Sequence, residues 1–171
     1  PAVSLGDPAA FGGTESMPLS KINKLSAEHL RRCWLNIPHV TQHDDAVITE
    51  LEAFRKKHKE AYKKKGIPLT PLAFILKALS NVLQQYPRFA SSLAKDGASL
   101  ILKKYCHLGV AVNTEDGLVV PVIRDVDQKS IIQLARELKF ISTKARNEGL
   151  SPKDIQGACM TVSSLGGIGG R

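Results

Sequence analysis

The sequence has few of the features that mark secreted, metal-binding or membrane proteins. Its three cysteines, at positions 33, 106 and 159, are odd in number and form no Cys-x-x-Cys pair, so we expect neither a disulfide framework nor a metal site. The longest apolar runs, 72–76 and 118–123, are far shorter than the roughly 20 residues of a membrane helix. Residues 1–16 lack a basic start and a continuous apolar run. We therefore expect reduced, buried thiols, no membrane span and a cytosol-like, cytoplasmic location.

Aromatic residues are also scarce, at 5% of the chain. Proteins that bind single-stranded nucleic acid stack bases on aromatic side chains, so this composition does not favour that function. The remaining composition is ordinary for a globular protein, with 43% apolar and 23% charged residues in a chain of 171. This length and composition fit one folded domain.

Positive charge is abundant but concentrated in one segment. Of the net charge of +8, most comes from residues 55–65, which hold seven Lys or Arg against one acid, Glu60. A solvated helix face explains such a run without any partner. A phosphate-bearing ligand or a nucleic acid is the alternative explanation.

Hydrophobic spacing predicts interleaved helices and strands. We expect helices at 20–35, 49–66, 70–86 and 131–149, a helical turn at 151–152, and strands at 39–47, 99–103, 107–113, 118–123 and 158–163. Thr49 and Glu52 have capping-box spacing, and Thr70 before Pro71 is typical of an N-cap. Residues 115–117, Glu-Asp-Gly, predict a hairpin turn. The expected fold class is therefore α/β, in a two-layer arrangement with a mixed sheet and helices on one face.

The chemistry-bearing part of the sequence is its end. Ser163 and Ser164 follow a predicted strand and precede a glycine-rich stretch that lacks the Gly-Lys-Ser/Thr of a phosphate loop and the third glycine of a dinucleotide fingerprint. A hydroxyl here either faces a ligand or satisfies a turn. The histidines, at positions 29, 39, 43, 58 and 107, form no legible Ser-His-Asp arrangement, and we expect structural roles for His39 and His107.

Four segments resemble a known family. They are Pro-His-Val-Thr-Gln at 38–42, Lys-Lys-Tyr-Cys-His-Leu-Gly-Val-Ala-Val at 103–112, Asp-Gly-Leu-Val-Val-Pro-Val-Ile-Arg-Asp-Val at 116–126, and Thr-Val-Ser-Ser-Leu-Gly-Gly-Ile-Gly-Gly at 161–170. The sequence from about 17 to 170 is similar to the catalytic domain of dihydrolipoamide acyltransferases, the core components of 2-oxo acid dehydrogenase complexes. The agreement is greatest with acetyltransferases of bacterial pyruvate dehydrogenase complexes.

The resemblance implies a chloramphenicol-acetyltransferase-like fold, a homotrimer with active sites between subunits, and assembly of trimers into a larger hollow core. Residues 1–16 would be the flexible linker that follows the lipoyl and peripheral-subunit-binding domains, through which other complex components bind. Residues 17–171 would then be the N-terminal two thirds of the catalytic domain, truncated at the C-terminus.

The resemblance also implies a reaction, the transfer of an acetyl group between a dihydrolipoyl arm and coenzyme A. Ser163 matches the serine that stabilises the oxyanion of the tetrahedral intermediate in the family. The positions that contact coenzyme A in relatives are occupied here by Arg55, Thr70, Asn113, Ser142, Ser163 and Ser164. Relatives can carry Asp and Gln in place of Asn113 and Ser142.

One element of the family's active site has no counterpart in this sequence. The catalytic histidine of the family lies in a His-x-x-x-Asp-Gly motif, and none of the five histidines is followed by Asp-Gly at that spacing. Without a positioned base, thiolate formation is left to solvent. We therefore expect this chain alone to be inactive, and a non-catalytic oligomeric scaffold is the alternative function.

Overall fold

The computed structural model describes residues 6–166. The chain forms two units, Pro1–Pro38 and His39–Arg171. In the first unit, the short helix η1 (Pro8–Ala10) precedes the helix α1 (Lys21–Asn36). The hydroxyl of Ser20 accepts a hydrogen bond from the Asn23 amide at 3.1 Å and caps α1. The predicted helix at 20–35 is therefore confirmed. Within the described residues, no helix is long and apolar enough to cross a membrane.

The strand predicted at 39–47 is wrong. These residues form neither helix nor strand, and all of them are exposed. Val40 and Val47 are each 95% exposed, so the apolar positions on which the prediction rested pack against nothing in the described chain. A strand is stabilised by pairing and by cross-strand side chains, and this segment has neither.

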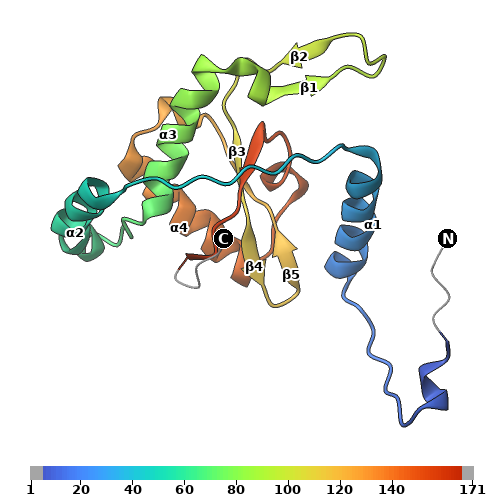
Figure 1. The fold of residues 1–171 in the computed structure, drawn as a ribbon. Coiled ribbons are helices and arrows are strands. Elements are labelled where there is room, and N and C mark those ends of the chain that lie inside the picture. Colours follow the sequence, from blue (N-terminus) through green and yellow to red (C-terminus); the bar gives the residue numbers. More distant parts are fainter. Residues whose placement is uncertain (1–5, 167–171) are drawn as a thin grey trace. The chain divides into compact units, whose positions relative to one another are not determined.

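Between residues 39 and 166, the second unit contains three longer helices and seven short strands, and Figure 1 shows how most of them are arranged. The helices are α2 (Thr49–Lys64), α3 (Pro71–Gln85) and α4 (Ile131–Asn147), with 3-10 turns η2 (Pro87–Ala90), η3 (Val126–Gln128) and η4 (Pro152–Asp154). The strands are β1 (Ser91–Leu93), β2 (Leu100–Leu102), β3 (Leu108–Val110), β4 (Val112–Thr114), β5 (Gly117–Val119), β6 (Val122–Ile123) and β7 (Met160–Val162). Except at 39–47, the predicted elements of this unit are present, and β1 was not predicted.

The helix α2 starts without its predicted capping box. Ile48 is the N-cap residue and makes no side-chain cap bond, while Thr49 is already helical. The Glu52 carboxylate cannot reach back to the helix start because it pairs with Arg55 instead. Gly66, with a φ of +74°, follows the helix in the left-handed conformation that glycine adopts most easily.

The sheet is mixed, as predicted. β3 pairs antiparallel with β6 and parallel with β7, giving the order β6-β3-β7. The predicted strand at 118–123 is divided into β5 and β6, and Pro121, which has no amide hydrogen to donate, lies between them. The β4–β5 hairpin pairs Thr114 with Gly117, which confirms the turn predicted there.

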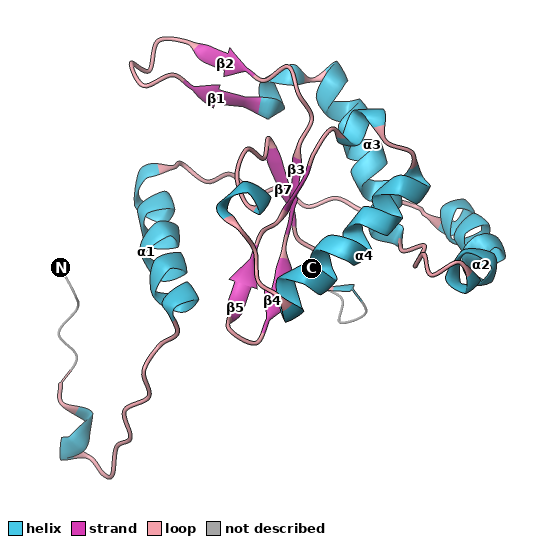
Figure 2. Cartoon of the chain, turned by 180° about the vertical axis from the view of Figure 1, so that it is seen from behind, coloured by secondary structure: helices cyan, strands magenta, loops and turns pink. Residues whose placement is uncertain are grey.

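The core lies between this sheet and the helices (Figure 2). α3 and α4 pack against each other, and α4 also contacts β4 and β6. The largest fully buried apolar side chains come from all these layers, and they are Leu76, Leu108, Ile123, Val126 and Leu134. The helical spacing of Leu134 and Ile141 in α4 therefore predicted the buried face correctly.

A second hairpin, β1–β2, forms its own two-stranded sheet. Its register pairs Ser91 with Leu102 and Leu93 with Leu100. Because directly paired residues and alternate residues share a face, Leu93, Leu100 and Leu102 lie on one face, where they are 66%, 43% and 40% exposed.

Candidate active site

Ser163 and Ser164 lie at one edge of the mixed sheet. The parallel pairing of β3 with β7 ends at Val110 opposite Val162, and the Ala111 amide donates to the Val162 carbonyl at 2.9 Å. Ser163 follows immediately and is exposed. The carboxyl ends of two parallel strands thus present their next residues at the same edge of the sheet.

Asn113 follows the end of β3 along the chain. It lies two residues beyond Ala111, on β4, opposite Leu118, and it is exposed. Because β4 pairs with β5 in a separate sheet, Asn113 is connected to the end of β7 through the last residues of β3. The Ser164 hydroxyl accepts a hydrogen bond from the Gly166 amide at 3.3 Å, so one of the two serines does satisfy a turn.

Arg55 is held by a tight ion pair on α2. Its Nε and Nη2 donate to the two carboxylate oxygens of Glu52, each at 2.7 Å, and its Nη1 donates to the Leu69 carbonyl at 3.3 Å. This hydrogen bonding lowers the pKa of Glu52 and raises the pKa of Arg55. Three of the five N–H donors of a guanidinium are therefore used, and two are left for a ligand.

Thr70 follows Leu69 at the start of α3. It is the N-cap residue, as predicted, but its side chain makes no cap hydrogen bond. The residue is exposed, so the hydroxyl stays open to solvent beside the segment that Arg55 contacts.

Ser142 lies on α4, and its hydroxyl donates to the Lys139 carbonyl at 3.1 Å. Lys139 in turn donates from Nζ to the Gly66 carbonyl at 2.9 Å, which joins α4 to the α2–α3 connection. Arg55 and Thr70 thus lie at the 66–70 connection, whereas α4 reaches it through Lys139 and the Ser142 hydroxyl bonds within its own helix. No hydrogen bond between described residues joins these residues to Asn113 and Ser163.

Sequence reasoning missed the contributions of Glu52 and Lys139. A carboxylate three residues before an arginine on a helix is a signal for an ion pair. The order Glu52-Ala-Phe-Arg55 carries that signal, but the capping-box interpretation of Glu52 took its place. The hydrogen bond from Lys139 to Gly66 links residues 73 positions apart, so no local sequence pattern predicts it.

The histidine that lies nearest to the sheet is structural. His107 accepts a hydrogen bond at Nδ1 from the Asp125 amide at 3.0 Å, and its side chain is mostly buried. This confirms the structural role predicted for His107. Groups of three His, Cys, Asp or Glu that could hold a metal ion do not occur in the part of the chain that the structure describes.

The three cysteines are free thiols, and Cys106 alone is fully buried. Burial, with the nearby Asp127 charge, raises the pKa of Cys106 from 9.0 to about 11. Cys33 and Cys159 are only half-buried, so the prediction of buried thiols is correct for one cysteine of the three.

A cavity of about 250 Å³ lies elsewhere in the second unit. Its walls include Leu83, Pro87, Lys103, Lys104 and Cys106. None of the six predicted site residues lines it. The open sheet edge and the 66–70 connection, rather than this cavity, carry the predicted chemistry.

The family assignment follows from comparison with known proteins. The family model described as 2-oxoacid dehydrogenases acyltransferase (catalytic domain) matches residues 11–171. The chain belongs to this acyltransferase family. Residues 167–170 of the motif lie outside the described residues, whereas Ser163, Ser164 and Gly166 lie inside them.

Curated members of the acyltransferase family match almost the whole chain. The dihydrolipoyllysine-residue acetyltransferase component of the pyruvate dehydrogenase complex from Pseudomonas aeruginosa is 51% identical over 99% of this chain. The protein of the same name from Haemophilus influenzae is 52% identical over 95% of it. The chain spans 31% and 29% of the length of these two relatives.

Solved acyltransferase structures share the fold. The dihydrolipoamide acetyltransferase of Azotobacter vinelandii, studied for the part of a serine, a histidine and an asparagine in its catalytic mechanism, superposes with a TM-score of 0.97 at 50% identity. A structure of the cubic core of the pyruvate dehydrogenase multienzyme complex gives 0.97 at 51% identity. Both matches cover 100% of this chain and 70% of the other. The expected chloramphenicol-acetyltransferase-like α/β fold is confirmed.

Proposed function

We propose that the chain is part of an enzyme that transfers an acetyl group between a dihydrolipoyl group and coenzyme A, as the core component of a pyruvate dehydrogenase complex. The observation that carries the proposal is the exposed Ser163 directly after β7, in a chain 51% identical to a dihydrolipoyllysine-residue acetyltransferase. In this proposal residues 17–171 belong to the catalytic domain and residues 1–16 to a linker.

The reaction is a thioester exchange. The sulfur of the incoming thiol attacks the acetyl carbonyl carbon, a base takes the thiol proton, and the carbonyl oxygen becomes an oxyanion. The Ser163 hydroxyl donates a hydrogen bond to that oxyanion, and the intermediate collapses when the other sulfur leaves with its electron pair. An oxyanion donor of this kind typically lowers the barrier by about 3 to 4 kcal/mol.

Coenzyme A binds, in this proposal, across both groups of predicted residues. The two unused N–H donors of Arg55 suit a phosphate oxygen, Thr70 supplies a hydroxyl beside the same connection, and Ser142 supplies one on α4. Asn113, Ser163 and Ser164 serve the thiol end at the sheet edge. The lipoyl group arrives on a lipoyl domain that this sequence does not contain.

The base is not one of this chain's histidines. His107 has its Nδ1 occupied by the Asp125 amide, and no histidine stands in the family's motif. In this proposal the 171 residues supply Ser163 and the coenzyme A contacts, and the base comes from outside them. A bacterial cytoplasm is the proposed compartment, in line with the bacterial relatives.

Assembly of copies into trimers and a larger core is also part of the proposal. A relative forms a cubic core. We therefore propose that a second copy of this chain covers the leucine face of β1–β2, which is formed by Leu93, Leu100 and Leu102. An isolated two-stranded hairpin is only marginally stable in water, and covering its leucines removes apolar surface from water.

Nuclear magnetic resonance on the labelled chain tests the proposed function. On addition of coenzyme A, amide shifts should move at 111–113, 163–164 and 66–70. Shifts confined to the exposed lysines of α2 would indicate charge attraction alone and would contradict the proposal. Oligomers without any shift would favour the alternative function, a non-catalytic scaffold.

A further inference from the structure

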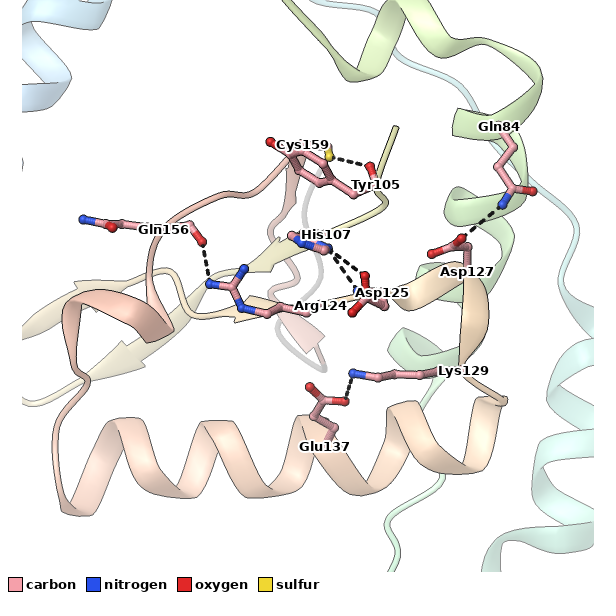
Figure 3. A network of polar contacts seen from close by, with 10 residues as sticks. All are labelled: Gln84, Tyr105, His107, Arg124, Asp125, Asp127, Lys129, Glu137, Gln156 and Cys159. Atoms are coloured by element: carbon pink, nitrogen blue, oxygen red, sulfur yellow. Dashed lines mark hydrogen bonds and ion pairs between the residues drawn. The ribbon is translucent and has the colours of Figure 1, made fainter. Parts of the chain in front are cut away.

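The start of β7 belongs to a ring made of hydrogen bonds and the chain between them, and Figure 3 draws its His107–Asp125 and Arg124–Gln156 contacts. The ring starts at His107, just before β3, continues through Asp125 and Arg124 after β6, crosses to the loop before β7, and returns through the Cys159 amide to the His107 carbonyl. Three segments distant in sequence meet there. Ser163 lies four residues beyond Cys159, at the other end of this short strand.

Arg124 holds the loop that leads into β7. Its Nη2 donates to the Lys153 carbonyl at 2.9 Å and to the Gln156 carbonyl at 3.2 Å. Gly157, with a φ of +88°, brings the backbone so close that a Cβ there would lie 3.6 Å from Arg124 Nη1. One exposed side chain therefore satisfies two carbonyls of this loop, which Lys144 also contacts through Asp154 at 2.8 Å.

The His107 imidazole holds the β6 end of the ring. Asp125 adopts a φ of +47°, an uncommon conformation for a residue with a side chain, and its amide donates to His107 Nδ1 at 3.0 Å. The carboxylate Oδ1 of Asp125 lies 3.6 Å from the same nitrogen, so both the main chain and the side chain of Asp125 face the imidazole. His107 thus bonds to Asp125, and the neighbouring residue Arg124 bonds to the loop.

The main chain of His107 closes the ring. Its carbonyl accepts from the Cys159 amide at 2.7 Å, and the Cys159 thiol donates to the Tyr105 carbonyl at 3.1 Å. These contacts immediately precede the parallel register in which Leu108 pairs with Met160. They lie at the start of β7, whereas the Ala111–Val162 hydrogen bond lies at its end.

We propose that His107 and Arg124 are positioning residues that hold β7 in register and thereby place Ser163 at the sheet edge. Neither side chain touches the reacting atoms in this proposal. The effect on Ser163 chemistry rests on the proposed function, whereas the effect on β7 does not.

Amide hydrogen exchange in the whole chain tests this proposal. His107→Leu removes the acceptor for Asp125, whereas the side-chain oxygen of His107→Asn can stand where Nδ1 stood. We expect exchange of the amides at 159–163 to rise at least tenfold in His107→Leu and to return to within about threefold of the wild-type rate in His107→Asn. Arg124→Met should reproduce the rise, and His58→Leu, on the basic helix, should leave it unchanged.

Two further outcomes are decisive. Because Arg124 is exposed, Arg124→Met keeps the test valid if His107→Leu unfolds throughout. Unchanged exchange at 159–163 in Arg124→Met, or no rescue by His107→Asn in a folded chain, overturns the proposal. Coenzyme A titration separates the two claims, since a wild-type chain that binds no coenzyme A contradicts the proposed function while the exchange data still decide the positioning role.

Discussion

Gly109 and Thr161 lie opposite each other in the parallel pairing of β3 with β7, with no room for a side chain at position 109. A Cβ at position 109 would lie 2.9 Å from Thr161 Oγ1 and 2.9 Å from Val120 Cγ1. The close packing explains why a strand with three buried positions has a residue without a side chain at its centre. It also places β7, which leads to Ser163, beside the strand whose end leads to Asn113.

Gly109→Ala should destabilise the fold. A methyl group inserted into this contact forces Thr161 or Val120 aside, and overpacking of this kind typically costs about 1 to 3 kcal/mol. Urea unfolding followed by circular dichroism measures the free energy of unfolding. Gly13→Ala is the matched control, because nothing lies within 4 Å of a Cβ there, and an equal loss in both variants would contradict the close contact.

The buried thiol of Cys106 predicts a loss of stability at high pH. Its pKa is about 11 in the folded chain against a usual 9.0, so the unfolded chain releases the proton first. The free energy of unfolding should therefore be unaffected by this group below pH 9 and fall by about 1 to 3 kcal/mol between pH 9 and 11. Cys106→Ala should flatten that part of the profile relative to Cys33→Ala, and parallel profiles for the two variants would be inconsistent with the burial of Cys106.

Ser163→Ala should separate catalysis from folding. The side chain is exposed, so the stability of the 171-residue chain should change by no more than about 0.5 kcal/mol. In an assembled enzyme in which this domain works with a base, kcat should fall by about 10²- to 10³-fold. Unchanged turnover in steady-state kinetics would remove Ser163 from the mechanism.

If copies of the chain assemble through the leucine face of β1–β2, removing apolar side chains from that face should weaken assembly. Replacing Leu93 and Leu100 together by Ser should lower the mass measured by light scattering toward that of the monomer. Leu118→Ser is the control, because Leu118 is 54% exposed on the other hairpin. A wild-type chain that is already monomeric, or equal masses in all variants, would count against the proposed interface.

Local patterns predicted most of the helices because their determinants lie within a few residues. The Ser130–Gln133 capping box forms in the structure, whereas the Thr49–Glu52 pair at the same spacing does not. The difference is Arg55, which captures the Glu52 carboxylate at 2.7 Å. Spacing identifies groups that can meet, but competition from a third side chain decides whether they do.

The strands and the site depend on contacts that are distant in sequence. Residues 39–47 have strand-like composition and yet form no strand in the described chain. The alignment of Ala111 with Val162, which connects the end of β7 to the end of β3, joins residues more than fifty positions apart. The residue types at the site could be named from sequence only through the family resemblance, while the ring that positions β7 could not.

The central claim is that this chain carries a coenzyme A site built partly by Arg55, and paired titrations test it most directly. Isothermal titration calorimetry should compare the wild-type chain with Arg55→Met and Lys57→Met, which remove one positive charge each from the same helix. We expect saturable binding of coenzyme A by the wild-type chain, at least tenfold weaker binding by Arg55→Met, and a change of less than about twofold for Lys57→Met. Absence of binding by the wild-type chain, or equal losses in the two variants, would contradict the account.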